Sequence, residues 1–530
     1  MYRIIIVLLI LSSLKSFSNP VLNLVPYPQK AEITGGRFKV ETGFKINASD
    51  DFQEVKEYLK SHTENWENAL NFNKKKKIFP VSLQIDSFII SGDEAYQLLI
   101  NKSGIVIRAT SKKGCFYGVQ TLIQLAELQD GNLWLPEVKI YDYPQFAWRS
   151  YMLDESRYFF GKEFVLRLLD ELAALKINKF HWHLTDDAGW RIEIKKYPKL
   201  TEIGAFRDST QINFNGQKWD SNTYDGKPHG GFYTQEDIKE IVAYAAVRNI
   251  DIIPEIEMPG HSSAAIAAYP WLGIVGEPGK VPVRFGKMEN SYNISNARVI
   301  TFLHDVLDEV CDLFPAEVIH IGGDEVLFGA WKESEEMQAY MKKNNIKTPS
   351  DAQIRFTNDI SKYLEANGKR MMGWNEILGK NVHGFENAVD YKSETVLSKK
   401  SVIHFWRGEI PLITEAAQNG YEIVNSLHTE TYLNYTYEDL PLQRMYNFKP
   451  MPDGLATKYH KNIIGVGVQM WTEWTPTSRD VEYHTYPRIA AVAEVAWSGA
   501  GEYSNFIQRL KNYSKRWTQK GINFPIEEIK

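Results

Sequence analysis

One unit repeats from Trp148 to the end of this 530-residue sequence: a short apolar segment, then a loop, then an amphipathic helix. Apolar spacing predicts the helices, as in Gly161–Leu175 and Thr234–Arg248. Eight apolar segments are read as strands: Ser150–Leu153, Lys179–His183, Asp251–Pro254, Glu317–Ile321, Arg370–Trp374, Ser401–Phe405, Tyr421–Asn425 and Ile464–Val468. Eight βα units over about 370 residues predict an α/β fold, a parallel (β/α)8 TIM barrel with sizeable loop insertions.

A smaller α+β accessory domain is predicted before the barrel. Its strands and helix are expected at Phe79–Ile90, Ala95–Asn101, Gly104–Ala109 and Cys115–Leu128, the last with apolar residues at helical spacing. A change of pattern near Asp142-Tyr143-Pro144 marks the boundary. We therefore divide the chain into a signal segment at 1–18, an accessory domain at 19–143 and a catalytic barrel at 144–530.

Residues 1–18 have the pattern of a secretory signal peptide. Arg3 supplies the positive start, Ile4–Leu11 the apolar run, and Ser16-Phe17-Ser18 a cleavage site between small residues. The apolar run is short for a bilayer, and no later segment has the length of a transmembrane helix. We expect an exported protein, periplasmic or extracellular, with no membrane span.

The composition limits the classes of molecule that this protein is expected to bind. Hydrophobic residues make up 43% of the chain, which is ordinary for a globular protein, and 61 basic against 66 acidic residues leave a net charge of −5. No basic excess favours a nucleic acid partner, and no pattern indicates the oligomeric state. The two cysteines, Cys115 and Cys311, leave a disulfide open, but their apolar settings favour free thiols. Their scarcity in an exported protein of this size favours a bacterial source.

Side chains that can bind a substrate or transfer a proton lie where the predicted strands end. In (β/α)8 barrels the active site lies at this end, so this rule shows where to look for candidate site residues. The rule selects Asp154, Arg157, His181, His183, Asp186, Asp187, Arg191, Glu255, Glu257, His261, Asp324, Glu325, Trp374, Asn375, Glu376, Trp406, Arg407, Tyr432, Asn434, Trp471, Thr472 and Glu473. Arginine and carboxylates bind hydroxyls, and tryptophan rings pack on apolar groups. The predicted site is therefore a sugar pocket, closed enough to favour a terminal residue.

Asp324 and Glu325 are the strongest candidates within this set. They follow the segment His320-Ile321-Gly322-Gly323, at the end of a buried strand. Burial and mutual repulsion raise the pKa of such a pair, so that one carboxyl can donate a proton while the other stays ionised. A lone Asp-Glu is more often a solvated strand end, and the neighbouring candidates overturn that reading.

Other candidates have structural alternatives. His181 and His183 alternate along one strand and suggest a metal site, but three or four convergent ligands are needed and no third partner has clear spacing. We expect neither metal nor cofactor. Trp374 and Trp406 could each be core residues, and Asp186 or Asp187 could cap the following helix.

Several segments in order resemble one family. HWHLTDDAGWRIEIKKYP, PEIEMPGH, HIGGDE, GWNEI and the late WTE resemble the pattern of glycoside hydrolase family 20, the β-N-acetylhexosaminidases. PYPQK and GCFYGVQTLIQL resemble that family's accessory domain, so the resemblance spans nearly the whole mature chain. It implies an exo-acting, retaining enzyme that removes terminal β-linked N-acetylglucosamine or N-acetylgalactosamine.

The resemblance also implies a division of roles. Retaining glycosidases usually hold two carboxyls about 5 Å apart across the bond, which neighbours on extended backbone do not easily do. In this family the sugar's own acetamido oxygen attacks instead, through an oxazolinium ion. Glu325 is then the acid/base and Asp324 orients the acetamido group. By the same resemblance, His261 with Asp186 would support the acid. Trp374, Trp406 and Trp471 would surround the methyl of the acetamido group, and Tyr432 would donate a hydrogen bond to its carbonyl. Arg157 and Glu473 would bind ring hydroxyls.

One position departs from the family pattern. Asn434 stands in Tyr432-Leu433-Asn434 where the family usually has Asp, and an amide accepts hydrogen bonds less strongly than a carboxylate. Sugar preference or affinity is therefore expected to differ. Two alternatives stay open: a relative that releases disaccharides, resembling a lacto-N-biosidase, and a catalytically silent glycan-binding barrel.

Overall fold

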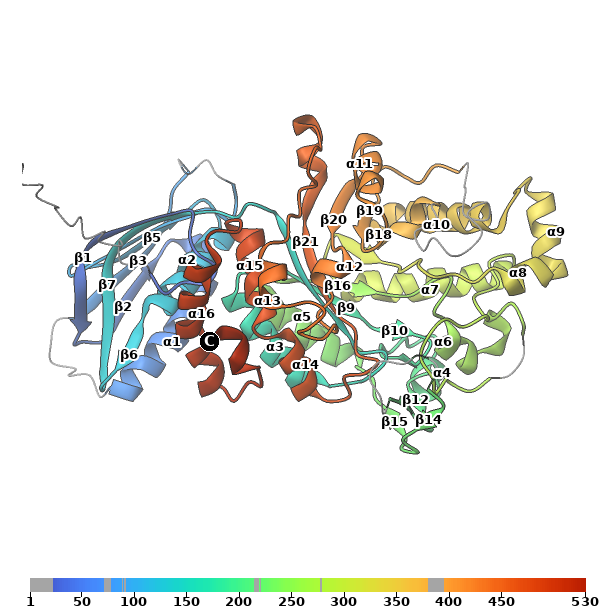
Figure 1. The fold of residues 1–530 in the computed structure, drawn as a ribbon, viewed down its shortest axis with the longest axis horizontal. Helices are drawn as coiled ribbons and strands as arrows, with labels where there is room; N and C mark the ends of the chain where they lie inside the picture. Colours follow the sequence, from blue (N-terminus) through green and yellow to red (C-terminus); the bar gives the residue numbers. More distant parts are fainter. Residues whose placement is uncertain are drawn as a thin grey trace, which may run out of the picture.

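The computed structural model describes residues 22–70, 78–87, 89, 92–213, 219, 221–276, 279–379 and 395–530. The predicted signal peptide lies outside these residues. Two bodies are visible, a blue sheet domain at one end and a larger barrel with its surrounding helices (Figure 1). Among the described residues, no helix combines the length and apolarity needed to cross a bilayer.

Eight parallel strands close into a barrel, in the order β16-β17-β18-β19-β20-β21-β8-β9. Their bounds are β8 (Trp148–Asp154), β9 (Lys179–His183), β16 (Asp251–Glu255), β17 (Val318–His320), β18 (Arg370–Trp374), β19 (Val402–Phe405), β20 (Glu422–Asn425) and β21 (Ile463–Met470). The predicted fold class is confirmed, and two of the predicted strands match residue for residue. Each strand is buried on both faces, which explains its continuous apolar sequence.

Helices on the outside of the barrel connect most of the strands. The long ones are α3 (Lys162–Ala174), α5 (Gln235–Val247), α7 (Ala297–Leu313), α10 (Pro349–Ala366), α11 (Ile410–Gln418), α15 (Arg488–Trp497) and α16 (Tyr503–Gln519). Local sequence determines where such a helix begins. At the start of α5, for example, Thr234 and Asp237 form a capping box. The shorter helices are α4 (Lys199–Glu202), α6 (Ser263–Ala268), α8 (Gly329–Glu333), α9 (Glu335–Lys343), α12 (His428–Thr431), α13 (Leu442–Tyr446) and α14 (Ser478–Thr485).

The accessory domain is a seven-stranded sheet with two helices. Along the sheet the order is β1-β7-β4-β5-β3-β2, with β6 paired to β7. The elements are β1 (Lys30–Val40), β2 (Phe44–Ala48), α1 (Gln53–Leu70), β3 (Phe79–Ile85), β4 (Tyr96–Asn101), β5 (Gly104–Ala109), α2 (Lys112–Leu125), β6 (Glu127–Gln129) and β7 (Asn132–Asp142). Four predicted bounds differ from the structure. The strand from Phe79 ends at Ile85, and its predicted end, Ile90, lies outside the described residues; β4 begins one residue later than predicted. The helix α2 begins three residues earlier than predicted, and it ends at Leu125 because β6 pairs with β7.

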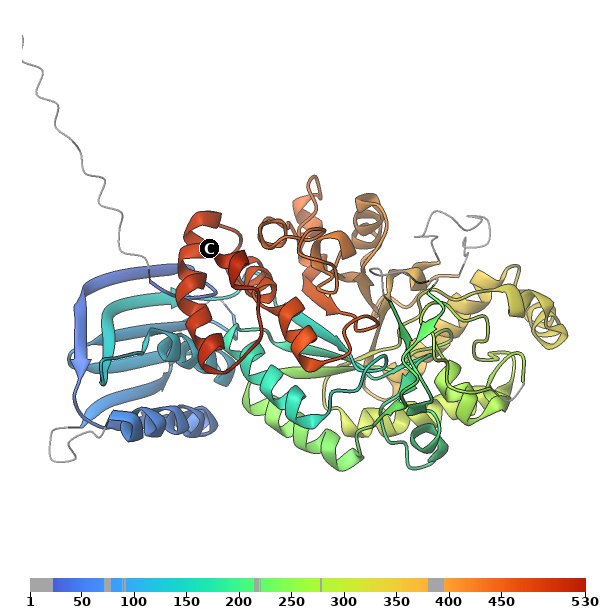
Figure 2. The same ribbon diagram turned by 60° about the horizontal axis from the view of Figure 1, so that its bottom comes forward.

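Buried charges join the accessory domain to the barrel. Lys176 Nζ lies 2.9 Å from Asp142 Oδ2, and Arg149 Nη1 lies 2.7 Å from Glu94 Oε2. The C-terminal helix α16 lies between the two bodies in both views (Figures 1 and 2). Arg509 on this helix donates to the carbonyl of Leu24 at 2.6 Å. These contacts hold the sheet against the side of the barrel.

The two cysteines are free thiols. Cys115 is buried in α2, and Cys311 is half-buried in α7. Of the two sequence-based alternatives, the structure therefore bears out the free thiols.

Candidate active site

The chain turns sharply where β17 ends. Gly322 has φ +65°, Gly323 has φ +88° and Glu325 has φ +51°, all in the left-handed region. Glycine adopts this region readily, whereas a glutamate there is uncommon and strained. Strained residues of this kind cluster at functional sites, which supports the assignment of Glu325 to the site.

His261 brings the two adjacent acids together. Its Nε2 lies 3.8 Å from Asp324 Oδ2 and 3.9 Å from Glu325 Oε2. Behind the ring, Nδ1 lies 3.0 Å from Asp187 Oδ2 and 3.4 Å from Asp186 Oδ1. The hydrogen bond thus goes to Asp187, whereas the sequence prediction paired His261 with Asp186. Asp186 remains in the charge cluster as a second carboxylate.

Arg157 contacts the other carboxylate oxygen of Asp186. Its Nη2 lies 2.8 Å from Asp186 Oδ2, and the guanidinium also contacts Asp154 at 3.3 Å and Glu473 at 3.8 Å. The arginine carbon lies 5.1 Å from the centre of the Trp471 ring. Arg157 and Glu473 therefore lie beside each other, and their binding of ring hydroxyls stays a prediction.

The charges in this cluster shift the pKa values of its members. Burial alone would lower the pKa of His261, but Asp186, Asp187 and Asp324 together raise it well above its usual value. Burial raises the pKa of Asp324 to about 8, opposed by the positive His261. The raised pKa of His261 favours its protonated form, and a pKa of about 8 leaves most Asp324 carboxyls protonated at neutral pH.

Glu257 is a further buried acid beside Asp324. Burial and the charge of Asp324 raise the pKa of Glu257 well above its usual range. Its Oε1 lies 3.5 Å from His183 Nε2, and a methyl group at Gly322 would lie 1.7 Å from its Oε2. Both acids cannot be charged at little cost, so the raised pKa of each favours its protonated form near neutral pH.

Aromatic rings form a wall beside this charged cluster. Trp374, Trp406 and Tyr432 make one buried cluster, with Trp471 packed against it. Tyr432 stacks parallel to Trp406 at 6.0 Å, and Trp374 lies 5.9 Å from Trp471. The structure thus brings the three predicted tryptophans and the tyrosine together. Asn434 is half-buried two residues beyond Tyr432.

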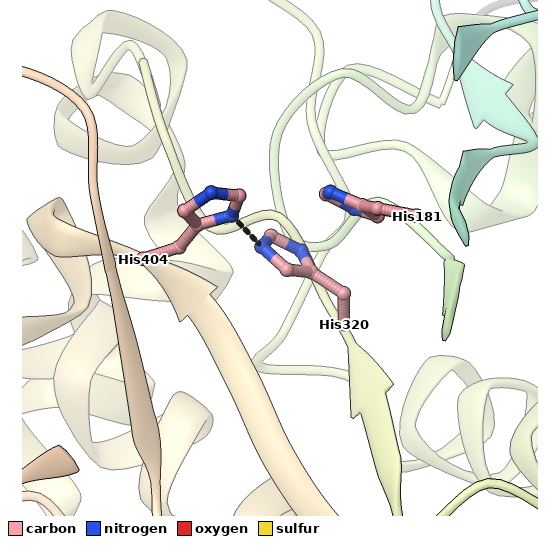
Figure 3. Close-up of side chains that lie close together, drawn as sticks. All are labelled: His181, His320 and His404. Carbon is pink, nitrogen blue, oxygen red and sulfur yellow. Dashed lines mark hydrogen bonds between the residues drawn. The ribbon is translucent and has the colours of Figure 1, made fainter. Parts of the chain in front are cut away.

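Three buried histidines lie beneath this wall. Figure 3 shows the rings of His181, His320 and His404, which come from β9, β17 and β19. His320 Nε2 lies 3.2 Å from His404 Nδ1, and Glu255 contacts His181 and His320 at 2.8 Å each. The sequence reading that His181 has no third partner is wrong, because the possible ligand atoms lie within 4.8 Å of one another. His404 stacks on Trp374 at 4.2 Å, so the hydrogen-bonded rings form the floor under that indole.

Sequence analysis gave no role to several residues of the site. The strand-end rule selected Asp187, Glu257 and Glu376 but did not say what they do, and Lys287 was not selected. Glu376 accepts a hydrogen bond from the Trp406 indole at 2.9 Å, and Lys287 lies 3.6 Å from Glu325 Oε1. Lys287 lies in a long insertion without periodicity, so no sequence signal marked it.

The fold and this site are typical of glycoside hydrolases. The acids lie at the carboxyl ends of the barrel strands, near the Arg157–Glu473 pair and near the cluster of indoles. Such a set of side chains can bind hydroxyls through its charged groups and an apolar substituent through its rings, while an acid protonates a leaving oxygen.

The comparisons with known proteins give the family. The model described as glycosyl hydrolase family 20, catalytic domain, matches residues 146–500, and that of domain 2 of the same family matches residues 21–143. The chain belongs to glycosyl hydrolase family 20.

Named relatives agree with the family assignment. The chain is 34% identical over 531 residues to a β-hexosaminidase from Porphyromonas gingivalis, covering 95% of this chain and 64% of that protein. Among solved structures, an exo β-N-acetylglucosaminidase of the same family from Vibrio harveyi, in complex with N-acetylglucosamine, superimposes with a TM-score of 0.81 at 30% identity, covering 95% and 78% of the two chains. A Flavobacterium johnsoniae chitobiase gives 0.76 at 33% identity, covering 94% and 73%. The chain thus spans just under two thirds of the Porphyromonas protein.

Proposed function

We propose that the protein is an exo-acting, retaining β-N-acetylhexosaminidase that removes terminal β-linked N-acetylglucosamine or N-acetylgalactosamine. The observation that carries the proposal is the adjacency of Asp324 and Glu325 beside one histidine, facing a buried aromatic cluster. The names of the relatives support the same activity.

The sugar's own acetamido group is the nucleophile in this mechanism. Two neighbouring residues do not readily flank one glycosidic bond, so a substrate that carries its nucleophile solves the geometric problem. The acetamido oxygen attacks the anomeric carbon, and the positive charge spreads onto the acetamido nitrogen. Trp374, Trp406 and Trp471 enclose the methyl, and Tyr432 donates to the carbonyl oxygen.

Asp324 stabilises the charge that develops on the acetamido nitrogen. Burial raises the pKa of Asp324 to about 8. A nearby positive charge favours the ionised carboxylate, so the interaction grows as the oxazolinium ion forms. An interaction that is stronger in the transition state than in the bound substrate lowers the barrier.

Glu325 transfers the proton. As an acid it protonates the glycosidic oxygen, and as a base it then activates the water that opens the oxazolinium ion, so the anomeric configuration is retained. His261 supports this role, since a cation 3.9 Å from Glu325 Oε2 steadies the carboxylate after proton transfer. Arg157 and Glu473 bind ring hydroxyls of the terminal sugar.

Direct product analysis tests the activity. Proton NMR of the purified protein acting on a β-linked N-acetylglucosamine oligosaccharide should show free monosaccharide appearing first as the β-anomer. Release of disaccharide would instead favour the lacto-N-biosidase-like alternative. Absence of hydrolysis on any β-N-acetylhexosaminide would leave a glycan-binding barrel and end the proposal.

We also propose that the mature protein is exported to the periplasm or the extracellular space of a bacterium. The pattern of residues 1–18 supports this. Edman sequencing of the natural protein should find an N-terminus just after Ser18. An intact Met1 on the natural protein would contradict export by this signal.

A further inference from the structure

Lys287 lies beside Glu325, the proposed acid/base. Its Nζ is 3.6 Å from Glu325 Oε1, while His261 approaches the other carboxylate oxygen. The exposed fraction of the side chain is 12% at Asp324, 22% at Glu325 and 24% at Lys287. Glu325 and Lys287 are therefore both more accessible than Asp324.

The place of Lys287 fixes which part of a substrate it can reach. A general acid protonates the oxygen that joins the terminal sugar to the departing group, so its outward side faces the departing group. Arg157 and Glu473 are assigned to the hydroxyls of the terminal sugar, whereas Lys287 contacts the acid itself. Because that acid lies at the bond to be broken, Lys287 is within reach of the departing sugar.

An exposed indole lies next to the loop that carries Lys287. Trp219 is 51% exposed, and a methyl group placed at Gly286 would lie 3.9 Å from its ring. The indole is supported from behind by Trp474 at 5.5 Å, which in turn contacts Phe285 at 5.4 Å. A supported ring with an open face can stack on the apolar face of a sugar.

We propose that Lys287 and Trp219 form a subsite for an acidic departing sugar. Lys287 pairs with the carboxylate of a uronic acid, and Trp219 packs against the sugar ring. The inference rests on the proposed function and narrows its substrate to N-acetylhexosamine β-linked to a uronic acid. An incoming carboxylate also competes for Lys287, which releases Glu325 Oε1 toward the glycosidic oxygen.

A matched pair of disaccharides tests the subsite. One carries N-acetylglucosamine β1,4-linked to glucuronic acid, and the other has glucose in place of glucuronic acid. The ratio of the two kcat/KM values isolates the carboxylate, because every other contact is shared. The wild-type protein should favour the acidic disaccharide, and added salt should reduce that preference because it screens a partly exposed pair.

Substitutions test which residue produces the preference for the acidic disaccharide. Lys287→Met should lower the acidic-to-neutral ratio about tenfold, as expected for loss of one charge-assisted hydrogen bond, and Lys287→Arg should keep most of it. Arg284→Met, which removes an exposed charge from the same loop, is the matched control and should leave the ratio unchanged. Trp219→Ala should lower kcat/KM on both disaccharides.

The outcomes separate this inference from the proposed function. A ratio in Lys287→Met equal to that of the wild type, with both disaccharides hydrolysed, overturns the subsite alone. So does a wild-type protein that favours the neutral disaccharide. Failure on both disaccharides and on an aryl N-acetylglucosaminide overturns the proposed function itself.

Discussion

Substituting alanine for Gly322 should destabilise the protein strongly and impair catalysis. Gly322 has φ +65°, where a residue with a Cβ costs roughly 1–2 kcal/mol. The new methyl would also lie 1.7 Å from Oε2 and 2.1 Å from Cδ of Glu257. Relieving such an overlap in a packed core typically costs about 1–3 kcal/mol. The two effects together predict a loss of about 2–5 kcal/mol in the free energy of unfolding.

Glu257 cannot easily move away from the added methyl. Its side chain is 2% exposed, and its Oε1 lies 3.5 Å from His183 Nε2. The backbone is also held, because the Gly322 carbonyl accepts from the Trp374 amide at 2.9 Å. Any shift therefore moves Trp374 or the turn that leads to Asp324. We expect kcat to fall together with stability.

Gly368 provides a matched control for the backbone contribution. It has φ +73°, and an added Cβ would meet no atom within 4 Å. Gly368→Ala should therefore cost only about 1–2 kcal/mol. Urea unfolding of both variants, followed by fluorescence, measures the difference. Equal losses in the two variants would refute the reasoning that Gly322 makes room for Glu257.

Four further substitutions test the site. Glu325→Gln should reduce kcat on an oligosaccharide by roughly 10²–10⁴, the usual share of an acid–base group, and near-normal turnover would remove Glu325 from that role. Asp324→Asn should lower kcat more than it raises KM in steady-state assays, because its charge is needed mainly in the transition state; a change in KM alone would contradict this. Asn434→Asp should lower KM for an aryl N-acetylglucosaminide severalfold by restoring a stronger acceptor, and an unchanged or higher KM would argue against hydroxyl binding there. His261→Gln should cost on the order of 1 kcal/mol of stability at pH 6 and less at pH 9, since the raised pKa of His261 stabilises the fold below pH 6.5 and that contribution fades as pH rises through the folded-state pKa; urea titrations showing the opposite order would contradict the charged state.

The barrel could be predicted from the sequence because its signals are local. β9 and β18 are short apolar runs bounded by loops, and α5 is marked by its capping residues. The accessory helix α2 was extended too far, because the pairing of β6 with β7 depends on residues distant in the sequence. Local periodicity does not report such pairing.

The sequence predicted which residues belong to the site better than it predicted which of them contact one another. The strand-end rule selected Asp324, Glu325 and the tryptophans, since parallel strands deliver their ends to one rim. It did not tell which neighbouring aspartate bonds His261, because both aspartates follow the same predicted strand. The rule did not select Lys287 because this residue lies in an insertion loop that has no regular spacing.

The sharpest test of the nucleophile compares two aryl glycosides that differ only at carbon 2 of the sugar. If the acetamido oxygen performs the attack, the N-acetylglucosaminide should be hydrolysed readily and the plain β-glucoside negligibly under the same conditions. Comparable kcat/KM values for the two glycosides would mean that a side chain, and not the substrate, supplies the nucleophile.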